Sequence, residues 1–103
     1  MAELQFSRQA LRDLEEIDTY TETNWGVAQA DRYLDQIQSH CELLAKNPGL
    51  GRQFHQRRPG VLRSEIGSHV LFYRRSERGL LVLRILHHRM MPENHISEEP
   101  FER

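Results

Sequence analysis

The stretch "VLRSEIGSHVLFYRRSERGLLVLRILHH", residues 61–88, contains three runs rich in aliphatic and aromatic residues. The runs "VLRSEI", "HVLFYRR" and "LLVLRILHH" have the length and composition typical of strands. Gly67 and Ser68 separate the first two runs, which matches a tight hairpin turn, and "ERG" separates the next two. This order predicts a three-strand antiparallel meander.

Two helices are predicted upstream of the meander. Ser7 is a candidate N-cap, and "NWG" at residues 24–26 and "NPGLG" at residues 47–51 end the two helical segments, because glycine and proline do not continue a helix. The short connection predicts an antiparallel helical hairpin. Apolar residues three or four apart form one stripe on each helix: Leu14, Ile17 and Tyr20 on the first, and Ala30, Tyr33, Leu34, Ile37, Cys41 and Leu44 on the second.

The remaining segments complete an α+β fold. "ELQFS", residues 3–7, alternates apolar and polar residues and predicts a short N-terminal strand, whereas residues 50–60 lack periodicity and predict a surface loop. A chain of 103 residues has the size of one domain. We expect that domain to span residues 1–96 and the acidic tail, residues 97–103, to be flexible.

Charge is unevenly distributed along the chain, although the net charge is only −1. Residues 1–51 hold nine acidic and four basic residues, whereas residues 52–89 hold nine arginines and two glutamates. Arginine forms paired hydrogen bonds with carboxylates, so the second block favours an acidic partner. No segment has the pattern of a signal peptide or membrane span, and we expect a cytoplasmic protein. The single cysteine, Cys41, lies on an apolar stripe and is expected to be a buried, unreactive thiol.

Alternation along the last strand predicts which side chains face the helices. The residues expected toward the helices are Leu81, Leu83, Ile85 and His87. The residues expected on the open face are Leu80, Val82, Arg84, Leu86 and His88. Arginines beside exposed apolar residues are typical of a partner-binding surface. The surface expected on this basis comprises Arg63, Arg74, Val82, Arg84 and Leu86.

The histidines could take part in two kinds of chemistry, metal binding and acid–base catalysis. A metal site is not predicted, because adjacent residues of a strand, such as His87 and His88, project to opposite faces and no ligand spacing is present. Cleavage of RNA needs an acid, a base and cations, which Arg63, Glu65, His87 and His88 could supply if they converge. The glycine and serine patterns of nucleotide-binding and acyl-transfer sites are absent.

The ordered series "NWG", "NPGLGR", "GSHVLFYR" and "LRILHHR" resembles the ParE toxins of the RelE/ParE superfamily, from about Leu4 to Ile96. The resemblance implies the same α+β fold and a non-enzymatic inhibitor of DNA gyrase that a ParD-like antitoxin neutralises. We expect the antitoxin to bind the open-face surface of Arg63, Arg74, Val82, Arg84 and Leu86. The resemblance also implies no cofactor and no direct binding of nucleic acid. RelE relatives instead cleave messenger RNA on the ribosome, often with a tyrosine near the C-terminus. This chain has no tyrosine after Tyr73, which favours the ParE function.

Two alternatives remain open at this level: a ribosome-dependent nuclease using Arg63, Glu65, His87 and His88, and a degenerate toxin that only binds its antitoxin. For gyrase inhibition, the expected contact segment follows the last strand and combines cationic and adaptable side chains. It comprises His88, Arg89, Met90 and Met91.

Overall fold

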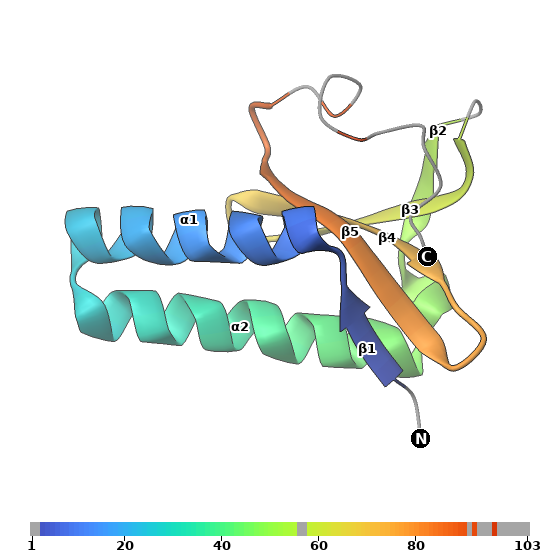
Figure 1. Ribbon diagram of the computed structural model, residues 1–103, viewed down its shortest axis with the longest axis horizontal. Coiled ribbons are helices and arrows are strands. Elements are labelled where there is room, and N and C mark those ends of the chain that lie inside the picture. Colours follow the sequence, from blue (N-terminus) through green and yellow to red (C-terminus); the bar gives the residue numbers. More distant parts are fainter. Residues whose placement is uncertain (1–2, 56–57, 91, 93–95, 97–103) are drawn as a thin grey trace.

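A computed structural model describes residues 3–55, 58–90, 92 and 96, apart from the side chain of His55. The elements follow one another as β1 (Glu3–Phe6), α1 (Arg8–Trp25), α2 (Val27–Lys46), η1 (Pro48–Leu50), β2 (Arg52–His55), β3 (Arg58–Ile66), β4 (His69–Arg75) and β5 (Gly79–His87). The predicted α+β fold is confirmed (Figure 1). The acidic tail lies outside the described residues.

The strands form one sheet in the order β1-β5-β4-β3-β2. β1 is parallel to β5, and the other neighbours are antiparallel. The prediction of a loop over residues 50–60 is wrong in part, because Arg52 pairs with Arg63 and Gln53 with Leu62. The four mostly polar residues of β2 show no alternation of apolar and polar side chains. Formation of β2 therefore depends on its backbone hydrogen bonds with β3.

The two helices lie side by side against one face of the sheet, and the end that carries their connecting turn projects beyond it (Figure 1). The Ser7 hydroxyl accepts a hydrogen bond from the Ala10 amide at 3.0 Å and donates one to the Leu83 carbonyl at 2.7 Å. The predicted N-cap is therefore confirmed, and the same side chain attaches α1 to β5. Gly26, with φ of 93°, occupies the turn between the helices, where its positive φ disfavours other residues.

The apolar stripe of α2 is confirmed, whereas that of α1 is one position off at its end. Tyr20, predicted to face the core, is 65% exposed, and Thr21 is buried instead. The Thr21 hydroxyl donates to the Ile17 carbonyl at 2.6 Å, which satisfies its polar group inside the helix. Neither α1 nor α2, the α-helices of the described chain, combines the length and hydrophobicity needed to span a membrane.

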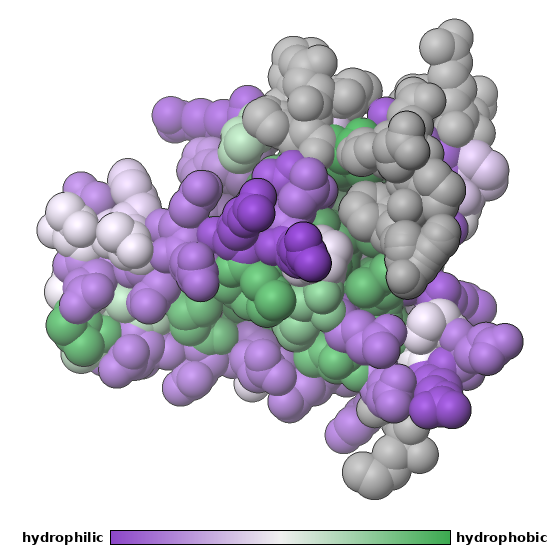
Figure 2. Space-filling model, viewed as in Figure 1, coloured by the Kyte–Doolittle hydropathy of each residue, from purple (hydrophilic) through white to green (hydrophobic). Residues whose placement is uncertain are grey.

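Apolar side chains are buried on both faces of the sheet. The helix-side core packs the hairpin against the sheet and contains Ala10, Ile17, Ile37, Cys41, Leu44, Ala45, Leu71, Tyr73, Leu80, Val82 and Ile85. The outer core lies on the opposite face and contains Val61, Val70, Phe72, Leu83, Leu86 and Ile96. Polar side chains surround the apolar ones over much of the surface (Figure 2).

A β-bulge divides β5 into two halves, and the side-chain alternation of one half is shifted by one residue relative to the other. Phe72 of β4 pairs with Arg84, whereas the next residue, Tyr73, pairs with Val82, so Leu83 is an additional residue in β5. An extra residue shifts the alternation of a strand by one position. A single alternation drawn through the whole strand therefore cannot be correct on both sides of the bulge.

The predicted faces are wrong before the bulge. Contrary to the prediction, the helix-side core contains Leu80 and Val82, and the outer core contains Leu81 as a partly buried neighbour and Leu83 as a member. Beyond the bulge, Ile85 and Leu86 lie on the predicted faces. Leu86, expected to be exposed, is only 1% exposed because the outer core covers it.

Candidate functional site

A row of four rings lies where the C-terminal end of β5 meets the turn between β3 and β4. The Tyr33 hydroxyl of α2 is 2.7 Å from Nδ1 of His69. The His69 ring meets the His87 ring edge-on at a centroid distance of 5.5 Å, and the His88 ring stacks on His87 at 4.4 Å. The prediction that His87 and His88 project to opposite faces is wrong, because His88 belongs to the turn after the strand.

The tight turn of residues 67–68, which the sequence predicts, holds this row in place. The Tyr33 hydroxyl accepts a hydrogen bond from the Ser68 amide at 3.2 Å, and the His88 amide donates to the Ser68 carbonyl at 2.9 Å. Gly67 has φ of 57°, and a β-carbon there would lie 2.7 Å from the Tyr33 hydroxyl oxygen. Glycine is thus required both by the turn and by the approach of the tyrosine.

The environment of His69 and His87 disfavours their protonation. Burial lowers the pKa of His69 to about 4, and the neighbouring His87 and His88 act in the same direction. Partial burial, with His88 and Arg89 nearby, also lowers the pKa of His87. The neutral His69 ring suits the contact with Tyr33, because one of its two tautomers leaves Nδ1 free to accept the hydroxyl proton. The lowered pKa values of His69 and His87 favour their neutral rings near neutral pH, so these two residues present uncharged π surface close to Arg89.

We expect stability to decrease as the pH falls from about 6.5, the pKa of an unfolded histidine, towards about 4, the pKa of folded His69. In this window the unfolded chain binds a proton that the folded chain does not, so protonation favours unfolding. Urea denaturation at several pH values measures the effect. His69→Gln, which keeps an acceptor for Tyr33, should flatten the dependence in part, since the lowered pKa values of His40 and His87 act in the same direction. An unchanged slope in this variant would contradict the assignment.

The predicted contact segment continues from this row. The Met90 amide donates to the His87 carbonyl at 2.9 Å, which closes a turn directly after β5. His88 and Arg89 are exposed, and Met90 is 37% exposed. Met91, the fourth residue predicted for this surface, lies outside the described residues. The three described residues thus form a continuous exposed surface with cationic and flexible apolar groups.

The four residues considered for RNA cleavage are divided between the two faces of the sheet. Arg63 lies over the ring of Phe72 in the outer core, 5.9 Å from its centroid, and its Nη2 is 3.7 Å from Oε2 of Glu65. His87 and His88 belong to the ring row that contacts Tyr33 of α2, on the helix side. The sheet separates the acidic and basic groups that such a reaction would need together.

Arg84, predicted for the open face, is a structural residue. Its Nε and Nη2 donate to the two carboxylate oxygens of Asp13 at 2.8 and 2.9 Å, and these bonds raise the pKa of Arg84. Asp13 also accepts a hydrogen bond from the Ile85 amide at 2.9 Å, although it is only 7% exposed. The side chain therefore turns from the bulge toward α1 instead of the solvent.

Sequence reasoning missed Asp13, and a signal for it was present. It follows Ala10 by three positions and precedes Ile17 by four, so it lies within the apolar stripe of α1. A carboxylate at such a position is buried and requires a cationic partner. The arginine that satisfies it is 71 positions away along the chain, which no local pattern identifies.

Of the predicted partner-binding residues, Arg63 and Arg74 remain accessible. Arg74 is exposed and pairs with Leu81, which packs at the outer core. Arg63 is partly exposed, and its Nε is buried without a hydrogen-bond partner among the described residues. Val82 and Leu86 are 0% and 1% exposed and do not contribute to a surface.

Cys41 is buried as predicted, and burial raises the pKa of its thiol to about 12, which keeps it in the unreactive protonated form. Among the residues that the structure describes, no three His, Cys, Asp or Glu side chains are grouped so that they could hold a metal ion.

Comparisons with known proteins identify the family. A family model described as "ParE toxin of type II toxin-antitoxin system, parDE" matches residues 4–92. Toxin ParE1 of Caulobacter vibrioides is 40% identical over 97 residues, which cover 94% of this chain and 100% of the relative. Toxin ParE1 of Mycobacterium tuberculosis is 45% identical over 78 residues, which cover 75% of this chain and 80% of the relative.

Solved structures show the same fold. A chain from the chromosomal ParDE TA system of P. aeruginosa superposes with a TM-score of 0.70 at 22% identity, and a chain of the toxin-antitoxin complex RelBE2 of M. tuberculosis does so with 0.64 at 20%. Each comparison covers 84% of this chain and 96% of the other. From the family match and the two ParE1 relatives, the chain belongs to the ParE toxin family of type II toxin–antitoxin systems.

Proposed function

We propose that this chain inhibits DNA gyrase by binding to it, without catalysing a reaction, and that a ParD-like antitoxin neutralises it. Membership of the ParE family over residues 4–92 is the observation that carries the proposal. In this proposal residues 1–96 form one toxin domain that acts in the cytoplasm, where gyrase works on DNA.

A function without catalysis is supported by the spatial separation of Arg63 and Glu65 from His87 and His88. Cleavage of RNA requires a proton donor and a proton acceptor within hydrogen-bond reach of one phosphodiester. These pairs lie on opposite faces of the sheet. Inhibition by contact makes no such demand, because it depends on the area and complementarity of one surface.

The surface proposed for gyrase comprises His88, Arg89 and Met90, together with Met91, which lies outside the described residues. Arginine and methionine suit this role, since the first is enriched where binding energy concentrates and the second adapts to irregular surfaces. The stacked His87 ring and the turn closed by the Met90 amide hold His88, Arg89 and Met90 at the end of β5. Side chains that contact the target from the turn after β5 are therefore held in place by the sheet.

The antitoxin is proposed to bind the face of the sheet opposite the helices, where Arg63 and Arg74 are accessible beside Leu81. An acidic segment there would place carboxylates near the exposed side chain of Arg74 and the partly exposed guanidinium of Arg63. Solved relatives of this fold come from toxin-antitoxin systems, one of them described as a complex. The likeness agrees with an antitoxin partner for this chain.

A supercoiling assay with purified gyrase, run beside an assay of ribosome-bound messenger RNA cleavage, tests the proposal. The intact chain should block supercoiling and leave the RNA whole. Arg89→Glu should weaken inhibition by about tenfold, the effect of losing roughly 1.4 kcal/mol of binding free energy. Arg78→Glu, an exposed change in the turn between β4 and β5, is the matched control and should have little effect.

Each other outcome contradicts the proposal in a distinct way. RNA cleavage that His87→Ala abolishes, with gyrase unaffected, would establish a nuclease. Binding of a ParD-like antitoxin with no effect in either assay would establish a degenerate toxin. For the proposed antitoxin surface, we expect the antitoxin to restore supercoiling in the presence of the wild-type toxin. It should fail to do so with the Arg74→Glu toxin and should still do so with the Arg78→Glu toxin.

A further inference from the structure

The turn end of the helical hairpin, residues 15–31, exposes large side chains that a stable monomer does not need at its surface. Tyr20 is 65% exposed, Trp25 is 71% exposed and Val27 is 58% exposed. Figure 1 shows that this end projects beyond the sheet, and Figure 2 shows apolar surface at its tip. Large side chains that are mostly exposed at one end of a hairpin are typical of a docking surface.

The same hairpin end is strongly acidic. Residues 15–31 contain five carboxylates and no lysine or arginine, and all five are exposed: Glu15, Glu16, Asp18, Glu22 and Asp31. The nearest following cation, Arg32, donates to Gln29 at 2.7 Å. Asp13, in contrast, is neutralised inside the fold by Arg84. The negative charge of the hairpin end is therefore directed to the solvent.

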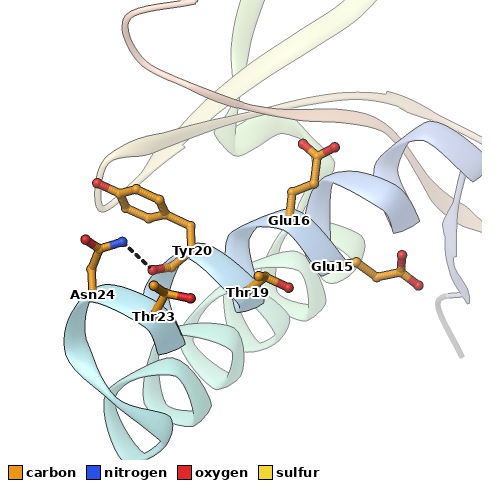
Figure 3. Close-up of a pocket in the computed structure, with 6 residues that line it drawn as sticks. All are labelled: Glu15, Glu16, Thr19, Tyr20, Thr23 and Asn24. Carbon is orange, nitrogen blue, oxygen red and sulfur yellow. Dashed lines mark hydrogen bonds between the residues drawn. The ribbon is translucent and has the colours of Figure 1, made fainter.

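The aromatic and acidic groups adjoin one another on α1. A shallow, largely open depression on α1 is lined by Glu15, Glu16, Thr19, Tyr20, Thr23 and Asn24. Figure 3 shows Glu16 and Tyr20 extending in the same direction from successive turns of the helix. Asn24 donates to the Tyr20 carbonyl at 2.8 Å, which ties the last turn of α1 to the one before it. A carboxylate beside an exposed ring is the arrangement that receives an arginine or lysine side chain.

We infer that the hairpin end is a second contact surface for the target, and that it receives a cationic, arginine- or lysine-bearing surface of gyrase. This inference rests on the function proposed above. An enzyme that holds DNA must present cations to the phosphates, and such a surface is complementary to five solvent-directed carboxylates. Tyr20 and Trp25 would stack with the cations, while Val27 would contact apolar neighbours.

In this proposal, surfaces of opposite charge on the toxin bind different partners. The accessible arginines Arg63 and Arg74 lie on the outer face of the sheet and suit an acidic antitoxin. The hairpin end carries carboxylates and suits a basic surface. The C-terminal end of β5, with Arg89, remains the first contact surface for gyrase. Binding at two separated places would orient the toxin on its target, which a single turn of four residues cannot do.

Binding of purified gyrase to the immobilised chain, measured without DNA, tests the inference. The double variant Tyr20→Ser, Trp25→Ser should weaken binding by at least about tenfold, as expected for two anchoring aromatic residues. Leu50→Ser is the matched control, because Leu50 is 59% exposed but lies in η1, away from the hairpin end. The charge variant Glu15→Gln, Glu22→Gln should also weaken binding, whereas Glu77→Gln in the β4–β5 turn should not.

Urea denaturation of each variant confirms that the exposed substitutions leave the fold intact. If the wild-type chain binds gyrase and the hairpin variants bind equally well, the inference is overturned while the proposed function stands. If the wild-type chain neither binds nor inhibits gyrase, both are overturned. Equal losses in the hairpin variants and in Leu50→Ser would also reject the hairpin end as the contact surface.

Discussion

Replacing Arg84 with alanine is expected to lower the free energy of unfolding by about 3–5 kcal/mol, the usual cost of leaving one member of a buried ion pair without its partner. Asp13 is 7% exposed and would lose two of the three hydrogen bonds described for it, keeping the one from the Ile85 amide. A protein of this size is stable by only about 5–15 kcal/mol, so the change removes a large fraction of that margin.

Urea denaturation monitored by circular dichroism measures this loss. The matched control is Arg78→Ala, because Arg78 also faces a carboxylate, Glu3 at 3.7 Å, but its side chain is 77% exposed. An exposed pair of this kind contributes at most about 1 kcal/mol. Similar small losses for both variants would show that the Asp13–Arg84 pair does not hold α1 on β5.

A second variant separates loss of charge balance from loss of packing. The double substitution Asp13→Leu, Arg84→Met removes both charges and should be more stable than Arg84→Ala, since no buried charge is left unpaired. An Arg84 substitution that abolishes toxicity in cells would therefore report on folding. It would not locate the antitoxin, contrary to what the alternation of the strand predicts.

Ile37→Ala is expected to lower the free energy of unfolding by about 2–5 kcal/mol, the range for truncating a buried isoleucine. Ile37 is 1% exposed and belongs to the helix-side core that joins α2 to the sheet. Its removal leaves a cavity between two elements that are far apart in the sequence, so neither can move to fill it without disturbing the other.

Leu43→Ala on the same helix is the control, because Leu43 is 47% exposed. Its truncation should change the stability by no more than about 0.5–1 kcal/mol. Denaturation curves for the two variants need only be compared with the wild type under the same conditions. An Ile37→Ala loss as small as that of Leu43→Ala would mean that the inward face of α2 is wrongly assigned.

The sequence by itself determined those features that depend on neighbouring residues. Ser7 caps α1 because its hydroxyl reaches an amide three positions ahead. Gly26 ends α1 because it accepts a positive φ, and the two residues after Ile66 close a turn. The inward stripe through Ile37 follows from the period of the helix. The same order of local signals, with the motifs that accompany it, was sufficient to predict the ParE family.

Only the tertiary structure decided the faces of β5 and the residues available for binding. Alternation shows that successive side chains of a strand point to opposite faces, but it does not show which face each residue occupies. The extra residue Leu83 shifts this assignment by one position within β5. The sequence also could not pair Arg84 with Asp13, 71 positions away, or separate Arg63 from His87 across the sheet. Residue types suggest the available chemistry, but distances between side chains depend on strand pairing and helix packing, which form between segments with no local relation in the sequence.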